Sequence, residues 1–248
     1  MFTTMDIKGR GPIILLLVST LVLCQYVASH PTCLSGPRCY MTIQEINNKA
    51  IYTTIQMQFN SLEVFLEFLK QYSQDPSFSY PNTRICHTAN ISVPAGQEEA
   101  RRMQHHDIIH TVIRYLIAWN EPLMHLALEE HRLTKLHDFF TLQGESISEI
   151  HQELKELIKL MSSQLGLEIT DKVEYPSWPE LQSLQSPDEK SFLSTFYNTL
   201  NCLFTDLQKI ESFLQLLKCR AFPDDDCNNL PFPFVSEMVF KNSSFGKV

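Results

Sequence analysis

The distribution of cysteines constrains this chain more than any other feature of its sequence. Six of the seven cysteines fall into three groups that are spread along the chain, Cys33 with Cys39, Cys86 far from Cys202, and Cys219 with Cys227. An even number of cysteines in a chain that enters the secretory pathway indicates a disulfide framework. The pattern therefore predicts an oxidised fold that is held by three bridges.

The N-terminal segment has the parts of a secretory signal peptide. Basic residues precede an apolar stretch at 13–23, and small residues at 27–29 offer a cleavage site. We expect residues 1–29 to form the signal peptide, whose removal also takes away Cys24 and leaves the six grouped cysteines. An uncleaved membrane anchor is the less favoured alternative, because the apolar stretch is too short to span a bilayer with ease.

Residues 30–248 are expected to form a single domain. This length can bury one core without a second domain. The net charge of −8 at pH 7 argues against nucleic acid and anionic membranes as partners, because both require a basic face. No later segment holds 18 consecutive apolar residues. We therefore expect a secreted, extracellular protein that is monomeric and does not insert into membranes.

Apolar residues recur at intervals of three and four in four stretches, which predicts an all-α fold. The four expected helices cover about residues 43–72, 97–130, 147–165 and 187–217. Capping boxes predict the starts of the first, third and fourth helices at Thr42, Ser146 and Ser186, the last with proline at the first helical position. Pro122 should kink the second helix, with Trp119 packed beside the kink.

The lengths of the connections predict how the four helices are arranged. About 24 residues join the first two helices, about 20 join the last two, and the middle link at 131–145 is shorter. A helix of 30 residues is about 45 Å long, and an extended loop of 24 residues spans up to about 80 Å, so such a loop can return to the starting end. Two long crossovers are what an up-up-down-down four-helix bundle of the cytokine type requires.

Counting alone leaves 15 possible pairings of the six cysteines. The expected architecture narrows the choice, because Cys86 lies in the first crossover and Cys202 lies midway along the last helix. A bridge between them would hold the crossover against the bundle. The two remaining bridges would each close a small terminal loop, Cys33 with Cys39 and Cys219 with Cys227.

Several short motifs are distinctive when they occur together in one chain. They are CHT at 86–88, AWNEPL at 118–123, EYPSW at 174–178 and the run from 202 to 220. With these motifs the chain resembles the prolactin family, within the growth hormone and prolactin group of four-helix cytokines. The resemblance extends from Cys33 to Cys227, and the N-terminal pair matches prolactins rather than growth hormones. It implies the three bridges above and a ligand for a single-pass cytokine receptor.

The resemblance also indicates a receptor-binding face on the first and last helices. The positions that match it are Ile55, Gln58, Thr205, Gln208, Lys209, Glu211 and Phe213. Prolactins carry histidines at the positions of Ile55, Gln58 and Gln208 and an arginine at the position of Thr205. A cation, an acid and an aromatic residue are kept, namely Lys209, Glu211 and Phe213. The replaced histidines lead us to expect weak or absent activation of the prolactin receptor.

Two further departures separate this chain from prolactins. A glycine on their third helix leaves a notch for a second receptor, and the matching residue here is Leu157, which either fills the notch or turns into the core. Prolactins end near the last cysteine, whereas this chain continues as a C-terminal tail from residue 228. In these respects the chain resembles the prolactin-related proteins of the placenta, which keep the scaffold while the receptor face changes.

Asn90 and Asn242 begin glycosylation sequons, for which the alternative is that they are not occupied. His106 and His110 are spaced to share a metal ion, and residues 224–226 are three aspartates. Because a zinc site needs three or four ligands and adjacent aspartates do not converge easily on calcium, we expect solvated surfaces and no metal.

An enzyme is not expected, because the chain has no HExxH, GxSxG, phosphate-binding or dinucleotide-binding motif. No cofactor is expected for the same reason. Two functions remain open, a hormone that activates a cytokine receptor and a secreted binding protein that engages another surface partner without signalling. A helical carrier for an apolar ligand is less favoured.

Overall fold

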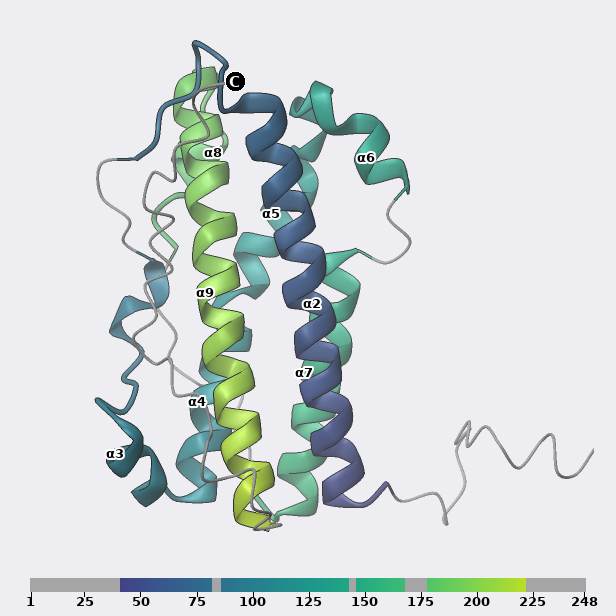
Figure 1. The fold of residues 1–248 in the computed structure, drawn as a ribbon, viewed down its shortest axis with the longest axis vertical. Coiled ribbons are helices and arrows are strands. Elements are labelled where there is room, and N and C mark those ends of the chain that lie inside the picture. Colours follow the sequence, from purple (N-terminus) through teal and green to yellow (C-terminus); the bar gives the residue numbers. More distant parts are fainter. Residues whose placement is uncertain (1–40, 82–85, 143–145, 168–177, 222–248) are drawn as a thin grey trace, which may run out of the picture. The chain divides into compact units, whose positions relative to one another are not determined.

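The computed structural model describes residues 41–81, 86–142, 146–167 and 178–221. The chain divides into two units, Met1–Met41 and Thr42–Val248, and the second contains every element named below. Within the described ranges all regular elements are helices (Figure 1). They are α2 (Ile43–Tyr72), η1 (His87–Asn90), α3 (Gln97–Arg102), α4 (His105–Ala118), α5 (Asn120–Glu129), η2 (Glu130–Arg132), η3 (Thr134–Leu136), α6 (His137–Leu142), α7 (Ile147–Gln164), α8 (Leu181–Leu184) and α9 (Glu189–Ala221). In this described part, none of the helices has the length and apolar character to cross a bilayer.

Two capping boxes start the first and third long helices where the sequence predicts them. The Thr42 hydroxyl accepts a hydrogen bond from the Glu45 backbone N–H at 3.2 Å, and the Glu45 carboxylate accepts one from the Thr42 N–H at 2.7 Å. Ser146 and Glu149 repeat this exchange at the start of α7. The backbone and hydroxyl donors lower the pKa of both carboxyl groups, because they stabilise the charged form.

The predicted capping residue of the last helix is wrong. The helix begins at Glu189, and the Asp188 carboxylate accepts a hydrogen bond from the Ser191 N–H at 2.9 Å. Ser186 instead accepts from the backbone N–H of Asp188, outside the helix. Aspartate is as good a capping residue as serine. Its hydrogen bond caps a helix that starts two residues later than predicted.

The predicted second helix is divided into α3, α4 and α5. Breaks occur at Met103–Gln104 and at Trp119, so the kink precedes Pro122 by three residues. The reason is local, because proline has no N–H to offer the carbonyl four residues earlier and its ring crowds that carbonyl. That carbonyl belongs to Ala118, the last residue of α4.

Two histidines from other elements satisfy carbonyl groups at this break. The ring Nε2 of His87, in the first crossover, lies 3.2 Å from the Ala118 oxygen, and the ring Nε2 of His151, on α7, lies 2.9 Å from the Leu116 oxygen. A carbonyl can only accept, so each Nε2 carries the hydrogen. Burial lowers the pKa of both rings, that of His151 to about 4.

The contacts show that α9 runs antiparallel to α2 and to α4. Near the start of α2, Asn47 contacts Leu214, and near its end the Phe65 ring lies 5.2 Å from the Tyr197 ring, so the numbering on α9 falls as that on α2 rises. The same relation holds between α4 and α9, because Arg220 donates to the carbonyl groups of α3 and of Met103, whereas Trp119 lies beside Asp206.

Helix α7 packs on α2 and α4, also in the antiparallel sense. Lys49 forms an ion pair with Glu153 at 2.6 Å, and the His151 bond to Leu116 links α7 to the end of α4. Figure 1 shows α2 and α9 side by side, with α7 next to α2.

The core contains the apolar stripe that the sequence predicts for the last helix. Its eight members are all buried, namely Leu193, Phe196, Leu200, Leu203, Leu207, Ile210, Leu214 and Leu217. Phe68 of α2 stacks on Phe196 at a ring distance of 5.4 Å and meets Phe78 of the first crossover edge-on at 5.6 Å. Aromatic packing therefore fastens the start of that crossover to the core.

The middle link carries the short helices η2, η3 and α6 within or beside the range predicted for it. Arg132 of this link donates to the carbonyl groups of Leu184 and Ser186, at 2.9 and 2.7 Å, and lies over the Phe192 ring. These contacts attach the end of the second crossover to the middle link and to the start of α9.

Candidate functional site

Two of the seven residues predicted for the receptor face meet across the seam between α2 and α9. The Gln58 amide donates to the Leu207 carbonyl at 3.2 Å and to the Glu211 carboxylate at 2.8 Å. Ile55 lies one turn earlier on α2 and is 45% exposed. The seam thus presents an amide–carboxylate pair beside an apolar side chain.

Thr205 and Gln208 lie on α9 and are half-buried. The Thr205 hydroxyl donates to the Asn201 carbonyl at 2.9 Å, so its hydrogen serves the helix itself. The Gln208 carbonyl likewise accepts from the Ser212 hydroxyl at 2.9 Å. At about 100° per residue, these two positions lie about 60–120° around α9 from Glu211.

Lys209 and Phe213 lie on a different side of α9 from the seam. They are about 160° around the helix from Glu211, on the side that meets α4. The Lys209 ammonium lies 5.4 Å from the centre of the Tyr115 ring of α4, and the Phe213 side chain has 0% exposure. The expectation that Phe213 presents its ring on the receptor face is therefore corrected. Helix periodicity places it with the buried positions.

A buried carboxylate organises the α4 side of α9, and the sequence reading missed it. Asp206 has no exposed surface, and its Oδ2 accepts hydrogen bonds from the Thr88 hydroxyl at 2.5 Å and the Trp119 indole N–H at 3.0 Å. Its Oδ1 accepts from the Lys209 ammonium at 2.9 Å. The sequence offers one signal for this role. Asp206 lies one helical turn after Cys202, the cysteine that is bridged to the first crossover. Lys209 is thus engaged with the scaffold rather than free to meet a partner.

Within the described ranges, the nearby hydroxyl of Tyr115 has no hydrogen-bond partner. Burial and the negative charge of Asp206 both raise the pKa of this phenol, so it stays neutral. Trp119 itself is 1% exposed, so the prediction that it packs beside the kink is confirmed, and its indole N–H additionally binds Asp206.

The bridge between Cys86 and Cys202 is present, with 5.5 Å between the two Cα atoms. It joins the first crossover to α9 one turn before Asp206, so the covalent link and the Thr88 bond hold the same short segment. Cys219 is also disulfide-bonded. Cys33, Cys39 and Cys227 lie outside the described residues, so the two terminal pairings remain predictions.

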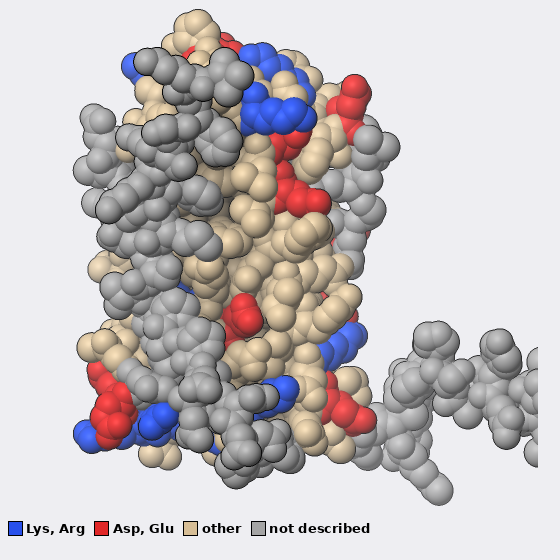
Figure 2. All heavy atoms as spheres, in the orientation of Figure 1, with Lys and Arg blue, Asp and Glu red and all other residues tan. Residues whose placement is uncertain are grey.

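An exposed apolar stripe on α2 extends the candidate site beyond the predicted residues. Tyr52, Ile55, Phe59 and Leu66 are 68, 45, 60 and 51% exposed and recur at steps of three, four and seven. Figure 2 shows that the middle of this face is mainly uncharged, while charged side chains gather toward its ends. Scattered apolar residues are normal on surfaces, whereas an aligned set indicates a site of contact. The spacing was visible in the sequence, but core and surface stripes look alike there.

Leu157 on α7 is only 6% exposed, so its side chain turns into the core. This is the second of the two alternatives that the sequence left open. Leu157 therefore gives no reason to exclude a second receptor.

Among the other predicted sites, Asn90 is exposed at the end of η1, as glycosylation requires, whereas Asn242 and residues 224–226 lie outside the described residues. The rings of His106 and His110 stack at 6.0 Å. Within the described ranges, no three His, Cys, Asp or Glu side chains are grouped to hold a metal ion.

One comparison with known proteins bears on this arrangement. The model of the somatotropin hormone family matches residues 16–227 of the chain. The matched range includes α2, α4, α7 and α9, the Cys86–Cys202 bridge and all seven residues of the predicted face.

Proposed function

Because the chain belongs to the somatotropin hormone family, we propose that it is a secreted, prolactin-like hormone that acts through a single-pass cytokine receptor. Members of this family are signalling hormones rather than enzymes, and they bind cytokine receptors. The observation that carries the proposal to this chain is the seam at Gln58 and Glu211, with the exposed stripe of α2 beside it.

The scaffold of the proposed hormone is an up-up-down-down bundle with three disulfides, formed by residues 30–248 after removal of the signal peptide 1–29. The antiparallel contacts of α9 with α2 and α4, and of α7 with the same two helices, support this topology. The two long crossovers support it as well. In this scheme Cys33 pairs with Cys39, and Cys219 with Cys227.

The receptor of the proposed hormone differs from the prolactin receptor. Ile55, Gln58 and Gln208 replace the histidines of the prolactin face. Lys209 and Phe213 keep the family residue type but face α4, so they contribute little contact surface. Polar partners left unpaired on a receptor cost about 1–3 kcal/mol each, so three losses weaken binding by roughly a thousandfold or more if they add.

We further propose a role in a pregnancy or placental setting, because the changed face on a kept scaffold resembles the prolactin-related proteins of the placenta. The proposed protein is monomeric, and Asn90 carries a glycan in the first crossover.

The second candidate function is a secreted binding protein that engages a surface partner without signalling. It is supported by the same substitutions, because a face that keeps apolar contact but loses polar anchors can bind without organising a receptor.

The test is to titrate the purified, secreted protein onto cells that display only the prolactin receptor and to measure receptor phosphorylation. We expect no phosphorylation at nanomolar doses, and phosphorylation there would show an ordinary lactogenic hormone.

A capture screen against placental and blood-cell surface proteins then identifies the receptor. Phe59→Ser, which removes a 60% exposed ring from the stripe, should weaken capture, whereas the matched change Leu128→Ser on α5 should not. Capture followed by phosphorylation supports the hormone, and capture alone supports the binding protein.

A further inference from the structure

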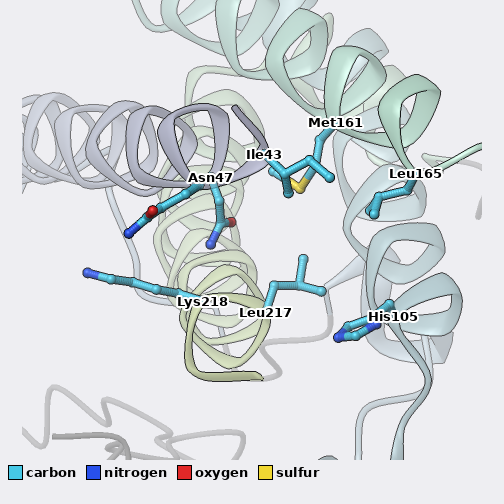
Figure 3. A pocket seen from close by; sticks show the side chains of 8 residues that line it. Ile43, Asn47, His105, Met161, Leu165, Leu217 and Lys218 are labelled. Atoms are coloured by element: carbon cyan, nitrogen blue, oxygen red, sulfur yellow. The ribbon is translucent and has the colours of Figure 1, made fainter. Parts of the chain in front are cut away.

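A cavity of about 270 Å³ lies at one end of the helices, where the starts of α2 and α4 meet the ends of α7 and α9 (Figure 3). Its volume is close to the lower end of the roughly 300–1,000 Å³ found for small-molecule sites. None of the predicted face residues lines it, so it is separate from the proposed receptor contact.

The walls of the cavity are largely hydrocarbon. Four apolar side chains line it, namely Ile43 of α2, Met161 of α7, Leu165 at the end of α7 and Leu217 of α9. Met161 and Leu217 are 1 and 7% exposed. Leu165 stands at the rim with 37% exposure. The turn after α7 holds it there, because Gly166 adopts a φ of +68° and the Leu167 N–H bonds back to the Ser162 carbonyl at 3.0 Å.

One buried polar atom in this wall, Asn47 Oδ1, has no hydrogen-bond partner among the described residues. The Asn47 side chain is 5% exposed, and its Nδ2 donates to the Leu214 carbonyl at 3.1 Å. That bond fixes the orientation of the amide, because only nitrogen can donate to a carbonyl. The Oδ1 atom then receives no hydrogen bond from the part of the chain that the structure describes, and an unsatisfied buried acceptor is costly to a folded protein.

The chemistry of the walls selects the class of ligand. The polar side chains of Gln44 and His105 are at exposed positions, and in Figure 3 the Lys218 nitrogen points away from Met161 and Leu165. An anionic group would therefore meet no buried cation among the described residues that line the cavity. Water is a poor occupant as well, because a buried water needs two to four polar partners, and the buried side chains in the described part of the wall offer one unpaired acceptor.

We propose that this cavity binds a small neutral molecule with a hydrocarbon body and one hydrogen-bond donor, in the manner of an aliphatic alcohol. The hydrocarbon body contacts Met161, Leu165 and Leu217, and the hydroxyl donates to Asn47 Oδ1. Bound in this way, the ligand satisfies the orphan acceptor and fills the space between α7 and α9. The site makes the hormone scaffold a carrier of a small molecule in addition to its receptor contact.

Two probes of equal size separate the roles of the hydroxyl and the hydrocarbon, 1-octanol and methyl heptyl ether, because only the alcohol can donate. The protein is labelled with ¹³C in its methionine methyl groups and titrated with each probe. Met161 reports the cavity, and Met124, which is 51% exposed on α5, serves as the internal control. We expect a saturable shift of Met161 without one of Met124. Octanol should bind about 5- to 100-fold more tightly than the ether, as expected for pairing a buried acceptor.

Three variants complete the test. Asn47→Leu should reduce the preference for octanol to about one while the hydrocarbon still binds. Leu165→Trp should cover the rim and weaken octanol by about tenfold or more, and this change at a partly exposed site keeps the test valid if Asn47→Leu does not fold. The matched control Leu128→Trp, at a 59% exposed site, should leave octanol binding unchanged. An unshifted Met161, equal affinities for the two probes, or an undiminished preference in Asn47→Leu would overturn the proposal.

Discussion

At the scale of single residues, buried polar side chains join parts of this protein that the apolar core also holds together. Asp206 binds residues from the first crossover, from the α4–α5 break and from its own helix. His87 and His151 donate hydrogen bonds to backbone carbonyl groups at that same break. Apart from the Lys209 bond within α9, each is a long-range contact of a group that would be costly to bury alone.

We predict that Asp206→Ala lowers the free energy of unfolding by about 3–5 kcal/mol, because it leaves the Lys209 ammonium, the Trp119 indole and the Thr88 hydroxyl without their shared acceptor. Urea unfolding followed by circular dichroism measures the change. The neighbouring Thr205→Ala, which removes one hydroxyl bonded within the helix, is the matched control and should cost less than about 1 kcal/mol. Equal costs for the two variants would show that the carboxylate does not organise this region.

The lowered pKa of His151 predicts that stability falls in mild acid. Its folded-state pKa of about 4 lies below the usual value of 6.5, so between these values the unfolded chain binds the proton and the folded protein does not. The contribution is complete above about pH 6.5 and is lost as the pH falls toward 4, up to about 3 kcal/mol. Unfolding curves at pH 7 and pH 5 measure it.

The control for this prediction is His151→Gln, whose amide can still donate to the Leu116 carbonyl but does not titrate. The variant should lose less stability than the wild-type protein between pH 7 and pH 5. A residual dependence is expected from His87, whose pKa burial also lowers. If wild type and variant lose the same amount, His151 is protonated in the folded state at pH 5.

At the scale of elements, the ends of the helices are set by local chemistry that can be changed one residue at a time. Capping boxes begin α2 and α7, an aspartate begins α9, and a glycine ends α7. The Gly166 N–H and the Leu167 N–H bond back to the Ser163 and Ser162 carbonyl groups, which closes the last turn of α7.

Gly166→Ala should cost about 1–2 kcal/mol, because a side chain is disfavoured at a φ of +68° even though open space surrounds the position. Gly96 is the matched control, since its backbone is extended and a Cβ there also meets no atom within 4 Å. Gly96→Ala should change stability by a few tenths of a kcal/mol. Thermal or urea unfolding of both variants compares them, and a harmless Gly166→Ala would mean that the turn re-forms without the left-handed residue.

At the scale of the whole molecule, two sides of α9 make different contacts with the described helices. One side meets α4 and the first crossover through the disulfide and Asp206, and the other meets α2 through Gln58 and Glu211. The second side, with the stripe on α2, carries an aligned set of exposed apolar side chains that suits a partner.

Receptor affinity should change little between pH 7.4 and about 6. Ile55, Gln58 and Gln208 stand where prolactins have histidines, and none of these side chains changes charge in the window where an unperturbed histidine does. Surface plasmon resonance on the captured receptor at both pH values measures this. Ile55→His supplies the matched contrast, because it should introduce a pH dependence. A wild-type affinity that changes more than about threefold, with unfolding controls normal, would place another titrating group in the contact.

The sequence by itself determined the features that depend on neighbouring residues. The bounds of α2, the capping boxes at Thr42 and Ser146, and the buried stripe of α9 follow from spacing and side-chain chemistry within a few turns. The Cys86–Cys202 pairing was predictable because each cysteine had no close partner along the chain.

Only the tertiary structure decided which way each side chain on these helices faces. Periodicity does not tell whether Phe213 and Lys209 belong to the receptor face or to the contact with α4, nor whether Leu157 lies inside or outside. The Asp206 network and the cavity at Asn47 join residues that are far apart in the chain. Their physical basis is the pairing or isolation of polar atoms in the core, which depends on all the elements that surround them at once.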